Sequence, residues 1–321
     1  MKMKKTLPLA PIAFSLCAAV CLSAVSLAGC GGKQTPVATV EVSPRQVRLP
    51  FSQVRTVHLA WTPTVALEGE PPTVFVHLLD ANRKVVRTFD HPFPQKWREG
   101  AQISYDLKLY QSSLAPPLPA GKYQVTLGLY NKEGRRWALE GLGEPKARNE
   151  YDVAEVEVPA ENPSPRFAFS PTWLPVEPGS DRQVLARRWM ADRAVIRLVD
   201  QSAPGTVWMV VQIPPTNLPD SKLVLDPGAS APSVLVIGNC GGTETNLSGP
   251  GVHEVELAMD APPPNGFCRV LLSSNFVLQP VAPTSRRHSI AVENIAWEPA
   301  GGAPAGKAAG SGEKSSPTSP Q

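Results

Sequence analysis

The most regular feature of the chain is an alternation of apolar and polar side chains with a period of two. In residues 103–109 (ISYDLKL) every odd position is apolar and every even position is polar. Residues 123–129 (YQVTLGL) and 153–158 (VAEVEV) follow a similar pattern, whereas 74–79 (VFVHLL) is apolar at nearly every position. The alternation predicts strands with one buried face, and the apolar run predicts a central strand.

The second half of the chain carries the same signals. Apolar or alternating runs are separated by clusters of Pro, Gly and Asn, and they lie at residues 194–200, 206–213, 222–226, 233–240, 253–260, 267–274 and 288–297. The apolar parity changes between Val292 and Ile295, which predicts a β-bulge. No helical stripe of useful length is present, and 36 prolines would interrupt helices. The pattern therefore predicts an all-β chain with two tandem β-sandwich domains.

Changes in composition divide the chain of 321 residues into six parts. We expect a signal peptide at 1–29, a tether at 30–37, a first sandwich at 38–158, a Pro-rich linker at 159–166, a second sandwich at 167–298 and a tail at 299–321. The tail has no aromatic or branched apolar residue, so it cannot offset the entropy of ordering and is expected to be disordered.

The first 30 residues have the layout of a bacterial export signal. Lysines at positions 2, 4 and 5 precede a long uncharged apolar run, and Leu27-Ala28-Gly29-Cys30 resembles the lipobox of bacterial lipoproteins. The resemblance implies cleavage before Cys30 and attachment of lipid to its thiol, which would anchor the protein to a membrane of the cell envelope. Gly31 does not mark retention in the inner membrane under the enterobacterial rule, which favours the outer membrane. The alternative is an uncleaved anchor with an incidental cysteine.

Cysteine usage agrees with export. Cys17 and Cys21 would leave with the signal and Cys30 would carry lipid, so that Cys240 and Cys268 remain as an even pair. In an oxidising compartment we expect these two to form a disulfide, worth on the order of 3 kcal/mol through loop closure. Two buried free thiols or half of a metal site are the alternatives.

Several motifs resemble two β-sandwich modules of bacterial membrane glycosyltransferase-like proteins and uncharacterised lipoproteins. In the first half these are VFVHLLD (74–80), DHPFPQKWREG (90–100) and LPAGKYQVTLGLY (118–130). In the second half they are WLPVEP (173–178), RRWMADRAVIRLV (187–199) and SRRHSIAVENIAW (285–297), where Ser-Arg-Arg replaces the usual Asp-x-Arg. The resemblance implies an Ig-like or jelly-roll-like sandwich in each half, the second similar to carbohydrate-binding modules. It implies no particular activity.

A search for reaction chemistry finds no zinc-protease, serine-hydrolase, Cys-x-x-Cys or calcium-loop motif, so we expect no enzyme activity, metal or cofactor. Removal of the signal takes the formal net charge from +3 to about zero, which gives no reason to expect a nucleic-acid partner.

The seven tryptophans are the best candidates for ligand contacts, because glycan sites on sandwiches combine aromatic rings with polar side chains. Trp61 and Trp189 are assigned to the cores. Trp97, in a Pro-rich loop, and Trp137, with Arg135 and Arg136 beside it, are predicted to be more exposed and are the candidate ligand-binding residues. Loop tryptophans often plug the open end of a sandwich, and this structural role is favoured over ligand stacking for both rings.

Three functional hypotheses follow. The preferred one is a non-enzymatic, lipid-anchored envelope protein that binds or scaffolds an extracytoplasmic ligand, either a glycan or an envelope protein. The second is a structural or assembly subunit of an envelope complex. The third is a glycan-active enzyme, which would need two carboxylates facing one another across a cleft.

Overall fold

The computed structural model describes residues 34–179, 184–280 and 286–301. In these ranges regular structure consists of 22 short strands, and no helix is long and apolar enough to cross a membrane. The predicted signal peptide, Cys30 and nearly all of the predicted tail lie outside the described residues. The prediction of an all-β chain built from sandwiches is confirmed.

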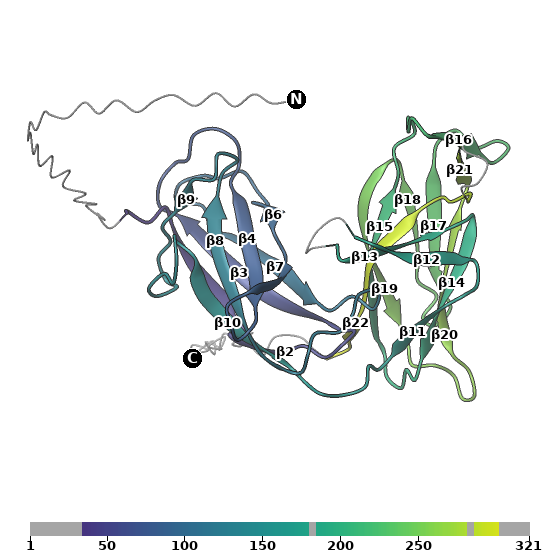
Figure 1. Ribbon diagram of the computed structural model, residues 1–321, viewed down its shortest axis with the longest axis horizontal. Coiled ribbons are helices and arrows are strands. Elements are labelled where there is room, and N and C mark those ends of the chain that lie inside the picture. The colour runs from purple at the N-terminus through teal and green to yellow at the C-terminus, as the bar shows by residue number, and fades with distance from the viewer. Residues whose placement is uncertain (1–33, 180–183, 281–285, 302–321) are drawn as a thin grey trace, which may run out of the picture. The chain divides into compact units, whose positions relative to one another are not determined.

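The first sandwich consists of two sheets (Figure 1). One has the order β1-β3-β7, with β1 at Ala38–Ser43, β3 at Val54–Pro63 and β7 at Ile103–Tyr110. The other has the order β2-β10-β8-β4-β5, with β2 at Gln46–Arg48, β10 at Tyr151–Val158, β8 at Gly121–Tyr130, β4 at Thr73–Leu79 and β5 at Val85–Thr88. The short strands β6 (His91–Pro92) and β9 (Arg136–Trp137) pair with β4 and β8. The β2–β10 pair is parallel, and the other strand pairs of these sheets are antiparallel.

The alternation along β8 sets its two faces. Its odd positions Tyr123 to Leu129 belong to the apolar core, together with Val74, Val76 and Leu78 of the neighbouring β4. Phe75, on the opposite face of β4, is also buried, with 1% of its surface exposed. The predicted central strand is therefore central, lying between β8 and β5 and covered on both faces.

The second sandwich consists of two sheets, each with five strands (Figure 1). One has the order β11-β14-β20-β17-β18, with β11 at Arg166–Phe169, β14 at Arg193–Val199, β20 at Cys268–Ser274, β17 at Ser233–Gly238 and β18 at Glu244–Ser248. The other has the order β12-β13-β22-β15-β19, with β12 at Trp173–Pro178, β13 at Ala186–Met190, β22 at Ala291–Pro299, β15 at Gly205–Ile213 and β19 at Gly251–Met259. A separate hairpin pairs β16 (Ser221–Leu225) with β21 (Phe276–Pro280).

The predicted bulge lies in β22. Val210 of β15 pairs with Asn294, and the next residue, Val211, pairs with Val292, so Glu293 is the extra residue. Val292 and Ile295 on either side both belong to the apolar core of the second sandwich. The bulge therefore keeps both flanking side chains in the core and gives the intervening polar residues a different direction.

The two sandwiches touch directly, and both lie in one compact unit that begins at Thr35. The Ser113 amide donates to the Ile295 carbonyl over 2.8 Å, and the Trp297 amide donates to the Ser52 carbonyl over 2.9 Å. The rings of Tyr110 (β7) and Trp208 (β15) lie with their centroids 4.5 Å apart. In addition to the linker, backbone bonds from Ser52 and Ser113 to β22 and a ring contact between β7 and β15 hold the two sandwiches together.

Candidate functional site

Trp97, one of the four predicted ligand residues, is not exposed. Only 8% of its surface is accessible, its ring packs on Phe93 at a centroid distance of 4.9 Å, and its indole N–H donates to the Val65 carbonyl over 2.8 Å. The prediction of an exposed ring is wrong, because the Pro-rich loop folds over the end of the sandwich and carries Trp97 into the core. A buried ring offers no face on which a sugar can stack.

The other three predicted residues lie on or beside β9. Trp137 is partly exposed, and the Arg135 guanidinium lies 5.8 Å from its ring centroid. Arg136 instead lies 4.4 Å from the centroid of the Phe75 ring and 3.4 Å from the Glu150 carboxylate. Among the described residues no hydrogen bond or ring contact joins Trp97 to these three. The four residues therefore do not form one site.

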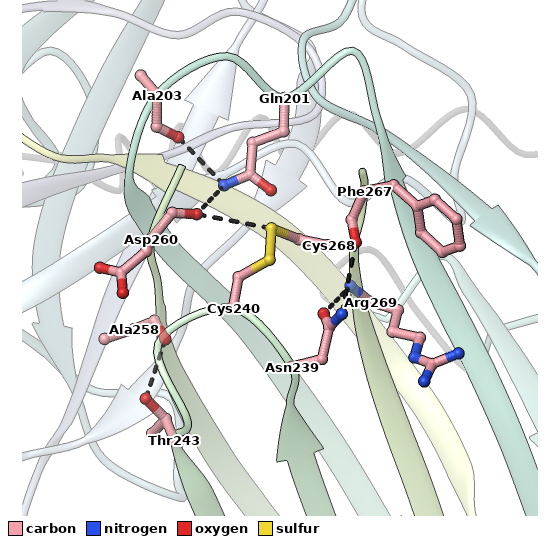
Figure 2. Close-up of a disulfide and its surroundings, with 10 residues drawn as sticks. All are labelled: Gln201, Ala203, Asn239, Cys240, Thr243, Ala258, Asp260, Phe267, Cys268 and Arg269. Atoms are coloured by element: carbon pink, nitrogen blue, oxygen red, sulfur yellow. Dashed lines mark hydrogen bonds between the residues drawn. A yellow bond between two sulfur atoms is a disulfide. The ribbon is translucent and has the colours of Figure 1, made fainter. Parts of the chain in front are cut away.

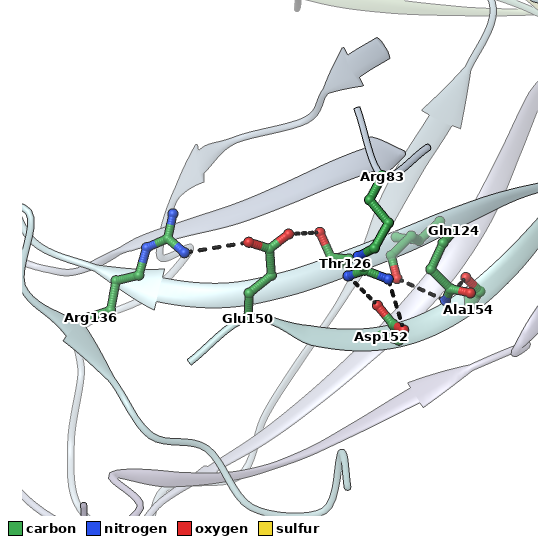
Figure 3. A network of polar contacts seen from close by, with 8 residues as sticks. Arg83, Gln124, Thr126, Arg136, Glu150, Asp152 and Ala154 are labelled. Atoms are coloured by element: carbon green, nitrogen blue, oxygen red, sulfur yellow. Dashed lines mark hydrogen bonds and ion pairs between the residues drawn. The ribbon is translucent and has the colours of Figure 1, made fainter. Parts of the chain in front are cut away.

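A polar network explains the position of Arg136 (Figure 3). The Thr126 hydroxyl, fully buried on β8, donates to Glu150 over 2.6 Å, and Glu150 also pairs with Arg136. Beside it, Arg83 donates two hydrogen bonds of 3.1 and 3.3 Å to the Asp152 carboxylate. These pairs pin loops onto the outer face of the β4–β8–β10 sheet. Arg136 is therefore engaged in holding the fold.

Two of the seven tryptophans are partly exposed, Trp137 and Trp189, while the other five are buried. The assignment of Trp61 to the core is confirmed, and that of Trp189 is wrong. Along β13 the buried positions are Ala186 and Met190, so Trp189 has the opposite parity and projects from the outer face.

Trp189 lies in a pocket of about 340 Å³ that we call the Trp189 pocket. Its lining consists of Leu174, Pro175, Glu177, Trp189, Arg286 and His288. The indole N–H donates to the Glu177 carboxylate over 3.0 Å, and the His288 ring meets the indole edge to face at 4.7 Å. His288 is itself fixed by a backbone hydrogen bond in which the Leu278 amide donates to its carbonyl over 2.6 Å.

The Trp189 pocket combines an aromatic surface with a carboxylate, a guanidinium and an imidazole. The hydrogen bond to Glu177 and the ring contact with His288 hold the indole in one orientation. Little side-chain entropy would therefore be lost when a ligand stacks on it. Glu177 and Arg286, both exposed, supply an acceptor and donors at the rim. This arrangement can recognise a flat apolar face bordered by hydroxyl groups.

A second and larger pocket, of about 560 Å³, lies where the sandwiches meet, and we call it the junction pocket. The first sandwich contributes Phe89, Asp90, His91, Tyr105, Asp106, Leu107, Lys108 and Tyr110, and the second contributes Val184, Trp208, Val210, Val252, Glu254, Glu293 and Asn294. Four of these side chains are carboxylates.

Hydrogen bonds order the histidine and tyrosine of the junction pocket. The Nδ1 atom of His91 lies 2.9 Å from the Phe89 carbonyl oxygen, and its Nε2 atom lies 2.7 Å from the Tyr105 hydroxyl oxygen. Burial lowers the pKa of His91 and raises the pKa of the Tyr105 phenol well above its usual value. At neutral pH the imidazole is therefore uncharged and the phenol keeps its proton, so Tyr105 donates to His91.

Lys108 bridges the two sandwiches at the edge of the junction pocket. Its ammonium group contacts Glu256 of β19 and lies 3.6 Å from Glu298 of β22. Burial works to lower the pKa of Lys108, but Glu256 and Glu298, together with the more weakly acting Glu254, outweigh burial and raise it. Lys108 therefore remains a cation whose charge is matched by carboxylates outside the pocket lining.

The predicted disulfide is confirmed. Cys240, just after β17, is bonded to Cys268, the first residue of β20, with the Cα atoms 5.5 Å apart (Figure 2). Asn239 secures the same turn, because its side-chain oxygen accepts from the Arg269 amide over 2.6 Å. The disulfide thus closes one end of a strand pair. Within the described residues no three His, Cys, Asp or Glu side chains are grouped as metal ligands.

Comparisons with known proteins assign no family. No protein-family model matches the chain, and no curated protein matches it. Solved structures that match include a mutant of Salmonella alpha-2-macroglobulin, with 13% identity over 83% of this chain and 15% of that one and a TM-score of 0.23. Native E. coli alpha-2-macroglobulin matches with 12% identity over 83% and 14% of the two chains and a TM-score of 0.21.

A third solved structure is a chaperone–tip adhesin complex for biogenesis of CFA/I fimbriae, with 11% identity, coverage of 84% and 87%, and a TM-score of 0.21. The chain spans only 15% and 14% of the length of the two macroglobulins. At TM-scores this low the likenesses carry no argument about this protein.

Proposed function

We propose that this protein is a non-enzymatic, lipid-anchored protein of the bacterial cell envelope that binds a glycan through the Trp189 pocket. The observation that carries the proposal is the partly exposed indole of Trp189, held in place by Glu177 and His288 and bordered by Arg286. Glycan recognition needs this combination of an ordered aromatic face and hydrogen-bonding groups at its rim.

The cellular location in this proposal rests on the sequence. The lipobox-like residues Leu27 to Cys30 follow a charged and then apolar leader, and lipid on Cys30 would tether the sandwiches outside the cytoplasm. We favour the outer membrane because Gly31 follows the anchoring cysteine. A disulfide between Cys240 and Cys268 is compatible with an oxidising compartment.

The proposal is tested by retention of the full chain, purified in detergent, on immobilised envelope polysaccharides. We expect the unaltered protein to be retained and Trp189→Ala to lose most of its retention. Trp137→Ala is the matched control, because Trp137 is the other partly exposed tryptophan. Equal retention of all three proteins, or no retention on any glycan, would remove the glycan proposal, and crosslinking to a defined envelope protein would then favour a scaffolding role.

A glycan-active enzyme is the second candidate, favoured by the four carboxylates in the junction pocket. Glycosidases use two such groups, one as an acid and one as a base or nucleophile. Incubation of the protein with the retained polysaccharide, followed by a reducing-end assay, separates the two candidates. We expect no new reducing ends, whereas release that Glu254→Gln and Glu293→Gln abolish would establish the enzyme.

A further inference from the structure

The junction pocket has a strong excess of negative charge. Three of its carboxylates carry this charge, Asp90, Asp106 and Glu254, whereas the fourth, Glu293, is engaged by another contact. Lys108 is the one permanent cation of the lining among the described residues. The charge of Lys108 is taken up by Glu256 and Glu298, which lie outside the pocket lining. The described lining therefore attracts cations and repels anions.

The carboxylates keep acceptor capacity for a ligand. Asp90 accepts from the Val76 amide over 3.0 Å and lies 3.4 Å from His77, and Glu254 accepts from the Trp208 indole N–H. A carboxylate has about four lone-pair positions, so these contacts fix its orientation without using all of them.

Aromatic side chains line the same space. Tyr110 packs against Phe89 edge to face and against Trp208, with centroid distances of 5.2 and 4.5 Å, and these three buried rings form the base of the pocket. Tyr105, held by His91, is partly exposed and is the ring of the lining that a ligand can reach. Aromatic faces attract an organic cation through their quadrupole, and this attraction adds to that of nearby carboxylates. A small bare metal ion would gain less from such walls than an organic ammonium group.

A separate feature, the unused amide of a largely buried asparagine, also points to a ligand. Asn294 has only 3% of its surface exposed and lines the junction pocket. Its neighbour Ile295 belongs to the apolar core, so the Asn294 side chain projects from the opposite face, toward the first sandwich. Within the described ranges no side-chain hydrogen bond engages its amide. The Asn294 amide atoms are not among the buried polar atoms without a partner, so they reach the surface of the pocket and are available to a polar ligand.

We infer that the junction pocket is a binding site for a small ligand that carries an organic ammonium group. Carboxylates from both sandwiches surround the cation, the Tyr105 ring contacts its alkyl substituents, and the Asn294 amide bonds to a neighbouring hydroxyl of the ligand. The inference concerns a different surface from the Trp189 pocket and stands or falls independently of glycan binding there.

The test is calorimetric titration of the full chain in detergent with choline, with ethanolamine, and with dimethylbutanol, the uncharged carbon isostere of choline. We expect choline to bind with a dissociation constant at least about tenfold below that of dimethylbutanol, because the isostere lacks the charge. Comparison of the dissociation constants of ethanolamine and choline shows whether the pocket prefers a primary or a quaternary ammonium group. Tighter binding of either cation than of the isostere supports the inference.

Rim variants keep the test independent of folding. Val252 lines the junction pocket with 65% of its surface exposed, so Val252→Lys and Val252→Glu should fold normally. We expect Val252→Lys to weaken cation binding about fivefold and Val252→Glu to strengthen it by a similar factor. Val176→Lys is the matched control, because Val176 is 46% exposed on β12, at the opposite edge of the same sheet.

Asn294→Leu should weaken choline binding as well, because leucine has a similar volume to asparagine but lacks the amide that bonds to the choline hydroxyl. Three outcomes would overturn the inference: no saturable cation binding, binding of both choline and ethanolamine no tighter than that of dimethylbutanol, or identical affinities in the Val252→Lys and Val176→Lys proteins.

Discussion

The phenol of Tyr123 donates a 2.8 Å hydrogen bond to the backbone carbonyl of Pro119, four residues earlier in the chain. Tyr123 is the first buried residue of β8, and Pro119 belongs to the turn that precedes the strand. Ig-like sandwiches contain a comparable tyrosine whose hydroxyl bonds to the backbone a few residues upstream. The segment Pro-Ala-Gly-Lys-Tyr (119–123) therefore has a structural role, which is to fix the entry into β8.

Removal of this hydroxyl should destabilise the first sandwich. Tyr123→Phe leaves the ring in the core and deletes one hydrogen bond, so we expect the free energy of unfolding to fall by about 1 to 1.5 kcal/mol. Chemical denaturation followed by tryptophan fluorescence measures it. Tyr130→Phe is the control, because Tyr130 lies partly exposed at the other end of β8. Equal losses in the two variants would contradict the role assigned to Tyr123.

Gly128 on β8 is predicted to tolerate no side chain. A Cβ atom there would lie 2.2 Å from the Phe75 ring and 2.7 Å from the Asn149 carbonyl oxygen. Relief of both clashes requires movement of a buried ring and of backbone, so Gly128→Ala should cost about 1 to 3 kcal/mol in unfolding experiments. Gly238→Ala is the matched control, because its nearest neighbour is the flexible thioether of Met259. A cost for Gly128→Ala no larger than the control's would be inconsistent with this packing.

The Cys240–Cys268 disulfide should contribute measurably to stability. It closes a loop with a sequence separation of 28, for which the chain-entropy relation gives about 3 to 4 kcal/mol. The double variant Cys240→Ser and Cys268→Ser, unfolded by denaturant under non-reducing conditions, should show a loss of this order. A reducing agent should destabilise the unaltered protein but leave the double variant unchanged. Sensitivity of the double variant to reduction would point to another cause.

The buried His91 predicts a loss of stability in mild acid. Its pKa is lowered in the folded state by burial, so below about pH 6.5, the usual value, the unfolded chain binds a proton that the folded chain does not. Stability should therefore be full above this pH and fall as the pH drops toward the folded pKa. Melting temperatures recorded between pH 8 and pH 5 measure it, and His91→Gln should flatten the curve over this range. An unchanged slope in His91→Gln would exclude His91 as the cause.

Lipid attachment is the prediction that tests the proposed location. In cells fed a labelled fatty acid, the protein should become labelled, and Cys30→Ser should remove the label and leave the precursor uncut. Cys21→Ser is the control, since Cys21 lies within the leader. Persistent labelling of the Cys30→Ser protein would show that another group accepts the lipid.

Much of the fold follows from local pattern, as β8 illustrates. Its odd residues are apolar and buried, and the same parity rule, applied outward from Met190, places Trp189 on the outer face. The tight patterning around Trp189 predicts a core position, whereas its parity relative to Met190 does not. The parity change at Glu293 was visible in the sequence and marked the bulge beside the junction pocket.

Other features depend on contacts that no local pattern contains. Trp97 has a loop-like sequence context, and only the folding of that loop over Val65 buries it. The junction pocket forms where β7 meets β15, β19 and β22, and each of these three strands begins more than about 90 residues after β7 ends. Alternation predicts which residues face outward, but it does not predict which outward faces meet.

Central to the account is the claim that Trp189 contacts glycan, and the indole N–H signals of the seven tryptophans report on it directly. A titration of the labelled full chain with the envelope polysaccharide that retains it, followed by proton–nitrogen correlation spectra, resolves each ring. The account predicts that the Trp189 signal shifts in a saturable way while the signals of buried Trp61 and Trp97 stay in place. A static Trp189 signal at polysaccharide concentrations that saturate retention would contradict it.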